Sequence, residues 1–282
     1  MQIKDLPLWV PDSSISVPSN VRRSIILTRQ PHSQLRAFLA SKGSLSTASH
    51  LKPGKLALKG VILGAIEVTG DACKRSEPGA TIMGLENIKT VQRWRSLARI
   101  ENAPNRVYRG PSQCIYNCSM GCQIHRSAPE TADDAFWEVL CSYLEQASPD
   151  GMTLGDQPLL RDLQAARKSY QEALESLMTP MQCSSKQRAN PYISDVIISV
   201  GSRRFFASRN PRELLGLAPF SAQVNDQIAI IIGSSVPHII RKHGDTRKLE
   251  WTYIGEAYVH GFTDGEALDL GGIQEVVLAY EL

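Results

Sequence analysis

The chain has 282 residues, of which 42% are hydrophobic and 21% are charged, and this composition excludes disordered tails, collagen-like chains and coiled-coil repeats. Its longest apolar runs fall short of the roughly 18 residues that cross a bilayer, so we expect no membrane helix. The first residues lack the charged-then-apolar profile of a secretory signal, which favours the cytoplasm, with the nucleus as the alternative, and six cysteines in the thiol form.

Charge is divided unevenly along the chain, although the net charge is only +3 at pH 7. Residues 1–110 contain 17 Lys and Arg against 7 Asp and Glu, and the remainder is acidic. The basic residues are dispersed, with almost no aromatic residues between them, so we do not expect a nucleic-acid partner. The pattern predicts solvated charge or contacts with the acidic part of the chain.

Residues 1–85 are expected to be extended. Pro7, Pro11, Pro18 and Pro31 forbid a continuous helix over the first part of this segment. Apolar residues then alternate with polar ones at the start of 55–63, directly after the turn signal Pro-Gly. The predicted strands of this segment are 24–28 and 55–63.

Residues 86–180 have the apolar spacing of helices. In 131–144, large apolar residues recur every three or four positions, with Thr131 as the expected N-cap and two aspartates in the first turn. A second helix is predicted over 159–178, and a shorter one around Ile88, Val91 and Trp94. We interpret this region as a helical insert.

Residues 181–282 return to the pattern of short strands separated by Gly, Asn and Asp. Strands at this spacing favour an antiparallel barrel or sandwich. The predicted strands are 196–200, 203–207, 227–232, 236–240, 251–254, 257–260 and 276–280. The sequence therefore predicts an α+β chain: an antiparallel β-barrel-like core at 181–282, joined by N-terminal strands from 1–85, with a helical insert between them.

Several segments, taken in order, resemble the C-terminal region of fungal heterokaryon-incompatibility proteins. The strongest match is Gly255–Leu268, which is similar to that family's GE-x-YVHG-x-x-DGEAL signature. A GRRFF-like strand matches Gly201–Phe206, and an apolar strand ending in G-x-x-x-P matches the run up to Pro237. Near the N-terminus, Leu6–Asp12 resembles the family's LPSWVPDW segment.

This resemblance implies a place in fungal self/non-self recognition and regulated cell death. The SYVWG-like and CINQ-like motifs of the family's toxic domain do not occur in this sequence. We therefore expect a truncated, non-catalytic accessory or recognition region that binds a protein partner or a separate incompatibility domain. The alternative is a zinc-dependent or acid–base hydrolase.

The signature carries the candidate site residues. Glu256, Tyr258 and His260 alternate, so on one strand they would share a face. Asp264 and Glu266 follow in a turn, and their carboxylates are expected to return toward His260. Three interpretations stay open: a partner-binding surface formed by these five residues, acid–base chemistry at His260, or a structural role. In the structural role, the turn glycines Gly255, Gly261 and Gly265 would allow the sharp bends.

A second chemical pattern consists of Cys114, Cys118, Cys122 and His125. Three thiols and an imidazole suit tetrahedral zinc, but zinc sites usually contain C-x-x-C pairs, and this spacing is different. Free thiols in a loop, a zinc site and a redox sensor all remain open, and no cofactor is expected by default. No serine occupies the G-x-S-x-G turn of a hydrolase.

Overall fold

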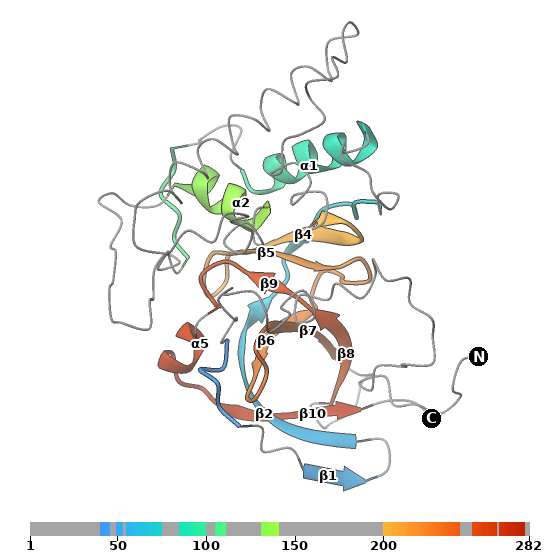
Figure 1. Ribbon diagram of the computed structural model, residues 1–282, viewed down its shortest axis with the longest axis vertical. Helices are drawn as coiled ribbons and strands as arrows, with labels where there is room; N and C mark the ends of the chain where they lie inside the picture. The colour runs from blue at the N-terminus through green and yellow to red at the C-terminus, as the bar shows by residue number, and fades with distance from the viewer. Residues whose placement is uncertain are drawn as a thin grey trace, which may run out of the picture.

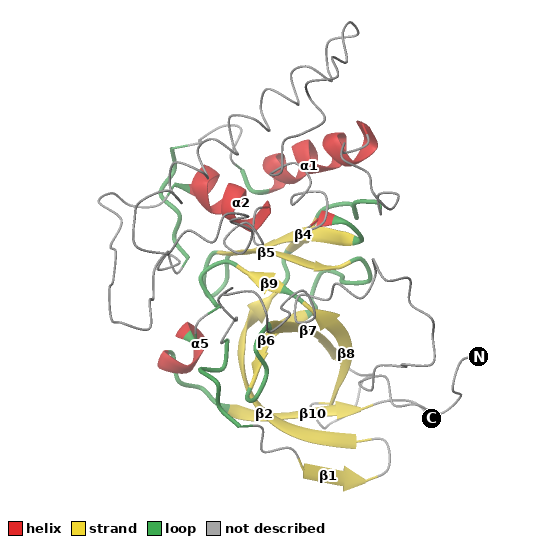
Figure 2. Ribbon diagram, viewed as in Figure 1, coloured by secondary structure: helices red, strands yellow, loops and turns green. Residues whose placement is uncertain are grey.

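The computed structural model describes residues 40–45, 49–52, 55–74, 85–99, 105–110, 131–140, 200–242, 250–263 and 265–279. Within these ranges the chain forms a barrel, a second sheet and short helices (Figures 1 and 2). The elements are β1 (Ser49–Lys52), β2 (Lys55–Ala65), β3 (Val68–Thr69), α1 (Leu85–Leu97), α2 (Ala132–Leu140), β4 (Arg203–Ser208), β5 (Leu214–Pro219), β6 (Gln227–Ile231), β7 (Pro237–Lys242), β8 (Glu250–Glu256), β9 (Tyr258–Val259), α5 (Glu266–Asp269) and β10 (Gln274–Ala279).

Five strands close the barrel in the order β2-β10-β8-β7-β6, because the long strand β2 also pairs with β6. Residues 55–60 of β2 pair with β10, and residues 60–65 pair with β6. The expected barrel is therefore present, and it includes an N-terminal strand. It is not wholly antiparallel, since β8 and β10 run parallel, with Val277 opposite Glu250. Closure leaves these apolar strands without exposed hydrogen-bonding edges along the seam.

Side chains from every barrel strand fill the interior. The interior cluster consists of Leu56, Ala229, Ile240, Trp251, Val276 and Leu278, with Leu58, Ile62 and Tyr253 packed against it. Apolar and polar residues alternate at the start of β2, and Leu56 and Leu58 lie inside the barrel. This agrees with a pleated strand, in which every second side chain points to the same face. Because large apolar side chains occupy the centre, the interior is a packed core.

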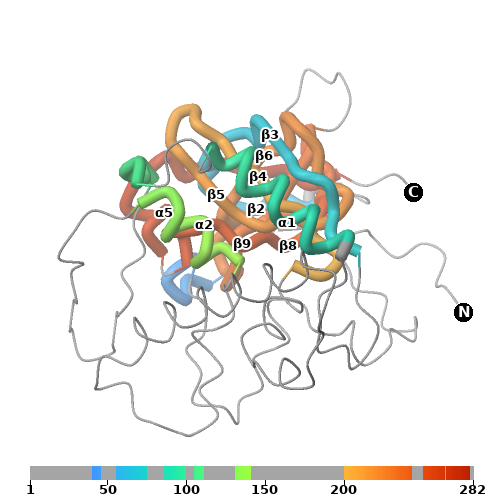
Figure 3. The backbone as a smooth tube through the Cα atoms, turned by 90° about the horizontal axis from the view of Figure 1, so that it is seen from above, coloured from blue at the N-terminus to red at the C-terminus, as the bar shows by residue number. Residues whose placement is uncertain are grey.

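The second sheet, β3-β4-β5-β9, lies between the barrel and the helices (Figure 1). Phe206, Leu214 and Val259 pack against the outer wall of the barrel. Phe205 and Leu217 point to the opposite face, where they meet the side chains of α1 and α2. Viewed from above, α1 and α2 lie over β4 and β5 (Figure 3). This sheet therefore belongs to two cores at once.

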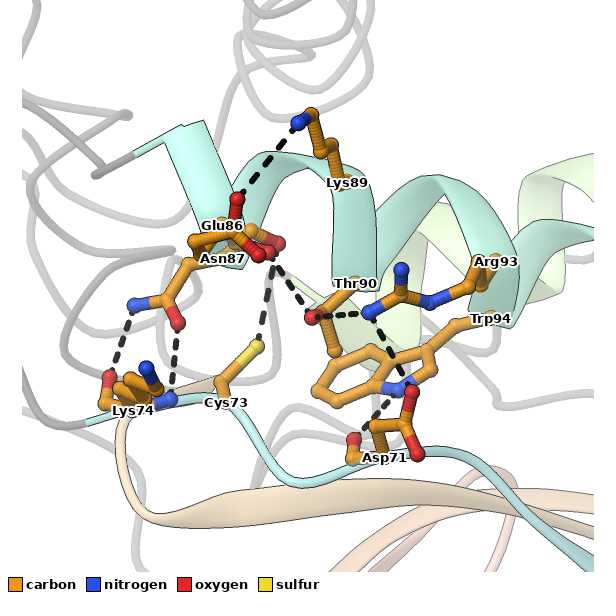
Figure 4. A network of polar contacts seen from close by, with 9 residues as sticks. All are labelled: Asp71, Cys73, Lys74, Glu86, Asn87, Lys89, Thr90, Arg93 and Trp94. Atoms are coloured by element: carbon orange, nitrogen blue, oxygen red, sulfur yellow. Dashed lines mark hydrogen bonds and ion pairs between the residues drawn. The ribbon is translucent and has the colours of Figure 1, made fainter.

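Hydrogen bonds between side chains of α1 and backbone groups of residues 71–74 attach this helix to the rest of the fold (Figure 4). The Trp94 indole Nε1 donates to the Asp71 carbonyl at 2.8 Å, and a Cβ on Gly70 would lie within 2.3 Å of that ring. The Asn87 amide donates to the Lys74 carbonyl and accepts from the Lys74 N–H, both at 2.7 Å. Position 70 therefore requires glycine, because any side chain would displace the indole.

Most of the predicted elements within the described residues are found. The helix at Ile88, Val91 and Trp94 is α1, and Thr131 caps α2 by accepting a hydrogen bond from the Asp134 N–H at 3.1 Å. The predicted strand 24–28 and helix 159–178 lie outside the described residues. Of the predicted strand 196–200 only Val200 is described, and it is helical. Strand β5 was not predicted.

The basic N-terminal region contacts acidic residues that come later in the chain. Lys55 pairs with Glu250 across the barrel strands. Arg106 pairs with Glu213 at 2.6 Å, and Arg95 of α1 pairs with the buried Asp133 of α2 at 2.9 Å. Part of the uneven charge distribution is therefore neutralised inside the fold.

Candidate functional site

The signature segment crosses from one sheet to the other. Glu256 is the last residue of β8 in the barrel, and Tyr258 begins β9 in the second sheet. Between them, the Ala257 N–H donates to the Pro237 carbonyl at 2.9 Å. The expectation that Glu256, Tyr258 and His260 share one strand face is therefore wrong, because the chain changes sheets at Ala257.

Two residues of the expected surface are buried. Tyr258 is 3% exposed and His260 is 0% exposed, whereas Glu256 and Glu266 are partly exposed. Asp264 lies outside the described residues. Tyr258 belongs to the core between the second sheet and the helices. These two side chains therefore cannot form part of a docking surface in this conformation.

The carboxylate nearest to His260 among the described contacts comes from α2. Nδ1 of His260 is 3.7 Å from Oε2 of Glu138, and the His260 ring lies 5.4 Å from the ring of Tyr108. The backbone N–H of His260 donates to the Leu215 carbonyl at 2.9 Å. His260 therefore joins three segments that are distant in the sequence, and this enclosed position favours a structural role.

Glu213, in the loop before β5, holds Tyr108 in place. Its carboxylate accepts hydrogen bonds from the Arg106 guanidinium at 2.9 and 2.6 Å and from the Arg109 N–H at 2.9 Å, and its carbonyl accepts from the Tyr108 hydroxyl at 3.1 Å. Burial raises the pKa of Glu213, but the bonds from Arg106 and Arg109 lower it more, so the net pKa is below its usual value. The ionised carboxylate is the form that this arrangement stabilises.

The three signature glycines adopt backbone angles that suit glycine. Gly261 and Gly265 have φ of 77° and 93°, and Gly255 has φ of 150°. A Cβ on Gly255 would lie 2.7 Å from Cγ of Pro219. These angles produce the bends that take the chain from the barrel to the second sheet and then into α5.

A second polar cluster, which sequence reasoning missed, joins Ser234, His238 and Tyr253. Nε2 of His238 is 2.6 Å from the Ser234 hydroxyl oxygen, and Nδ1 is 3.3 Å from the Tyr253 hydroxyl oxygen. Burial lowers the pKa of His238 to about 4 and, with the nearby charge of Glu256, raises the pKa of Tyr253. The imidazole is therefore neutral and only weakly basic.

The contact between Ser234 and His238 resembles part of a catalytic triad, but its chemistry does not support nucleophilic activation. A general base is most effective when its pKa lies near the working pH. The ring nitrogen facing away from Ser234 meets a phenol, where a triad has a carboxylate that stabilises the imidazolium. Ser234 also contacts the backbone of Val236. The cluster therefore fixes the turn between β6 and β7.

The comparison with protein families decides the classification. The model of the Het-6 beta-barrel domain matches residues 53–276, a span that begins two residues before β2 and ends within β10. The chain belongs to this family. The matched span includes the whole of the second sheet, α1, α2 and the barrel strands β2, β6, β7 and β8, together with the start of β10. No curated protein and no solved structure matches the chain.

The remaining predicted site residues are not positioned by the structure. Cys114, Cys118, Cys122 and His125 lie outside the described residues. Within the described ranges, no group of three or more His, Cys, Asp or Glu side chains is arranged to hold a metal ion. No helix in those ranges has the length and apolar character needed to cross a membrane.

Proposed function

We propose that this chain is a non-catalytic recognition module in a heterokaryon-incompatibility system and that it binds a separate protein in the cytoplasm. Membership of the Het-6 beta-barrel domain family supports the biological context. The observation that carries the non-catalytic assignment is the burial of His260, which is 0% exposed and enclosed by Tyr108 and Glu138. Acid–base catalysis requires contact with a substrate, and an enclosed imidazole does not provide it.

The structural role of the signature residues supports the same conclusion. The histidine, tyrosine and glycines of the signature connect the barrel, the second sheet and α2, so these residues hold the fold together. A recognition module needs a rigid scaffold that presents loops, and binding residues are concentrated on such loops. The regulated cell death expected of the system would then depend on what this scaffold binds.

A genetic experiment tests the proposed role. The gene is deleted in the fungus that encodes it, and the deletion strain is paired with tester strains. We expect the outcome of at least one pairing to change between compatible and incompatible, and the full chain to restore it. His238→Phe should also restore it, because that imidazole is not proposed to do chemistry. Unchanged outcomes in every pairing would contradict the role.

A biochemical experiment tests the hydrolase alternative. The purified, untagged chain is assayed with ester, phosphoester and peptide substrates, and its zinc content is measured. We expect no turnover above that of the His260→Phe variant and no stoichiometric zinc. Turnover abolished by His260→Phe, or zinc that is lost in Cys118→Ser, would favour the hydrolase and overturn the non-catalytic assignment.

A further inference from the structure

The loop between β5 and β6, residues 220–226, presents apolar side chains to solvent. Phe220 is 63% exposed and Val224 is 48% exposed. Between them, Ala222 is fully buried in the core that joins the second sheet to the barrel. The loop is therefore anchored at its centre while a large aromatic ring stands free at its start.

Hydrogen bonds fix the conformation of this loop. The Arg241 guanidinium donates to both carboxylate oxygens of Asp226, at 2.7 and 2.9 Å, and to the Ser221 carbonyl at 2.9 Å. The Asp226 carboxylate also accepts from the Gln223 N–H at 2.8 Å. Because these hydrogen bonds already fix the conformation of the loop, the loop would lose little conformational entropy on binding. That loss is one of the main free-energy costs of association.

The exposed surface of the loop carries no charge. Its exposed residues are Phe220, Ser221, Gln223, Val224 and Asn225. Its single ionisable residue, Asp226, is 1% exposed and is paired with Arg241. Aromatic residues with few charges are typical of the centre of a protein–protein interface. Lipid headgroups and nucleic-acid phosphates select Lys and Arg, which this loop does not expose.

The base of the loop lies next to the start of the signature segment, where Glu256 is partly exposed. Pro219, which precedes Phe220, approaches Gly255 so closely that a Cβ there would lie 2.7 Å from Cγ of Pro219. Arg203, opposite Pro219 in the sheet, donates to the Glu256 carbonyl at 3.1 Å. The partly exposed Glu256 therefore lies beside the base of the loop.

We propose that the β5–β6 loop is the docking epitope for a separate protein and that Phe220 inserts into an apolar pocket on that protein, rimmed by neutral hydrogen-bonding groups. This inference rests on the proposed recognition function. A phenylalanine side chain can bury roughly 150–250 Å² of surface at most. Each partner in a standard interface buries roughly 800 Å², which is far more. The ring is thus the anchor of a larger contact, and the pocket that receives it lies on the separate protein.

Photo-crosslinking in the native host tests the docking epitope. A photoreactive phenylalanine replaces Phe220 in the full chain, and in separate strains it replaces Ile273 or Leu270, which are exposed apolar residues on another loop. We expect the variant at position 220 to form an adduct with one protein and the variants at 270 and 273 not to do so. The protein in the adduct is identified by mass spectrometry and then purified.

Affinity measurements with that purified protein complete the test. Phe220→Ala should weaken binding at least tenfold, whereas the matched control Ile273→Ala should leave the affinity unchanged. Adducts at position 220 with only lipid or a second copy of this chain, or equal affinity for both variants, would overturn the proposed epitope. A protein adduct only at position 270 or 273 would overturn the epitope and leave the recognition function standing. Protein adducts at no position would contradict both.

Discussion

His238 illustrates how burial alone sets the properties of a residue. Its pKa falls from 6.5 to about 4 because the charged imidazolium would be desolvated. In the unfolded chain the imidazole binds a proton as the pH falls below about 6.5, whereas in the folded chain it stays neutral until about pH 4. The unfolded state therefore binds more protons across this window, and acid stabilises it relative to the folded state.

We expect the contribution of His238 to folding stability to be complete above pH 6.5 and to be lost progressively between pH 6.5 and 4, by up to about 3 kcal/mol. The measurement is the free energy of unfolding in urea at several pH values for the wild type and for His238→Phe. Other groups titrate in both proteins, so the difference isolates His238. The wild type should lose stability more steeply, and parallel profiles would contradict the neutral, buried imidazole.

Gly261 provides a second test on a single residue. Its φ of 77° lies in the left-handed region that β-branched residues avoid. Gly261→Val should therefore lower the free energy of unfolding by about 1–3 kcal/mol. Thermal unfolding measures this loss as a lower melting midpoint. A midpoint equal to that of the wild type would mean that the turn does not require glycine.

Among the elements, α1 depends on one asparagine for its attachment. Asn87 is 6% exposed, and its side chain satisfies both the N–H and the carbonyl of Lys74. Asn87→Ala leaves both groups without these partners, and we expect a loss of about 1–3 kcal/mol, slightly reduced by the better helix propensity of alanine. Lys89→Ala, on the exposed face of the same helix, is the control and should change stability by less than about 0.5 kcal/mol. Equal effects in urea unfolding would show that the asparagine is dispensable.

The elements also show which parts of the fold can be predicted from sequence. The alternation in β2 and the 3.6-residue period of α1 and α2 indicate which face is buried, so these elements were predicted. Strand β5 was missed because Gly216 interrupts an otherwise apolar run. The glycine is needed there because a Cβ would lie 2.2 Å from the Tyr258 carbonyl and 2.5 Å from the Phe206 ring. That requirement arises from two other strands and leaves no local signal.

The candidate site was harder to predict for the same reason. Tyr108 and Glu138, which enclose His260, come from segments whose sequence gives no indication of that contact. Residue spacing also suggested one strand for Glu256 to His260, whereas the chain passes between two sheets. Turn glycines were recognisable because their backbone requirement is local. Contacts between distant segments are set by topology, which a single sequence does not display.

At the scale of the whole molecule, the second sheet couples the helices to the barrel. Phe205 and Phe206 are adjacent in β4, yet Phe205 packs against Trp94 and Phe136, and Phe206 packs in the core shared with the barrel. Because one thin sheet contributes to both cores, loss of either core would remove support from the other. The helical region is therefore expected to unfold together with the barrel as one cooperative unit.

Hydrogen exchange at increasing urea concentrations measures this coupling. We expect the slowest amides of α1 and α2 to share one opening free energy with those of β5 and β6, with the same dependence on urea. Phe205→Ala and Phe206→Ala form a matched pair, and each should lower this common value by about 3–5 kcal/mol. If Phe205→Ala instead frees the helices while the barrel amides stay protected, the helices are a separate unit. The second sheet would then cover the barrel, and the stability of the helices would not depend on that of the barrel.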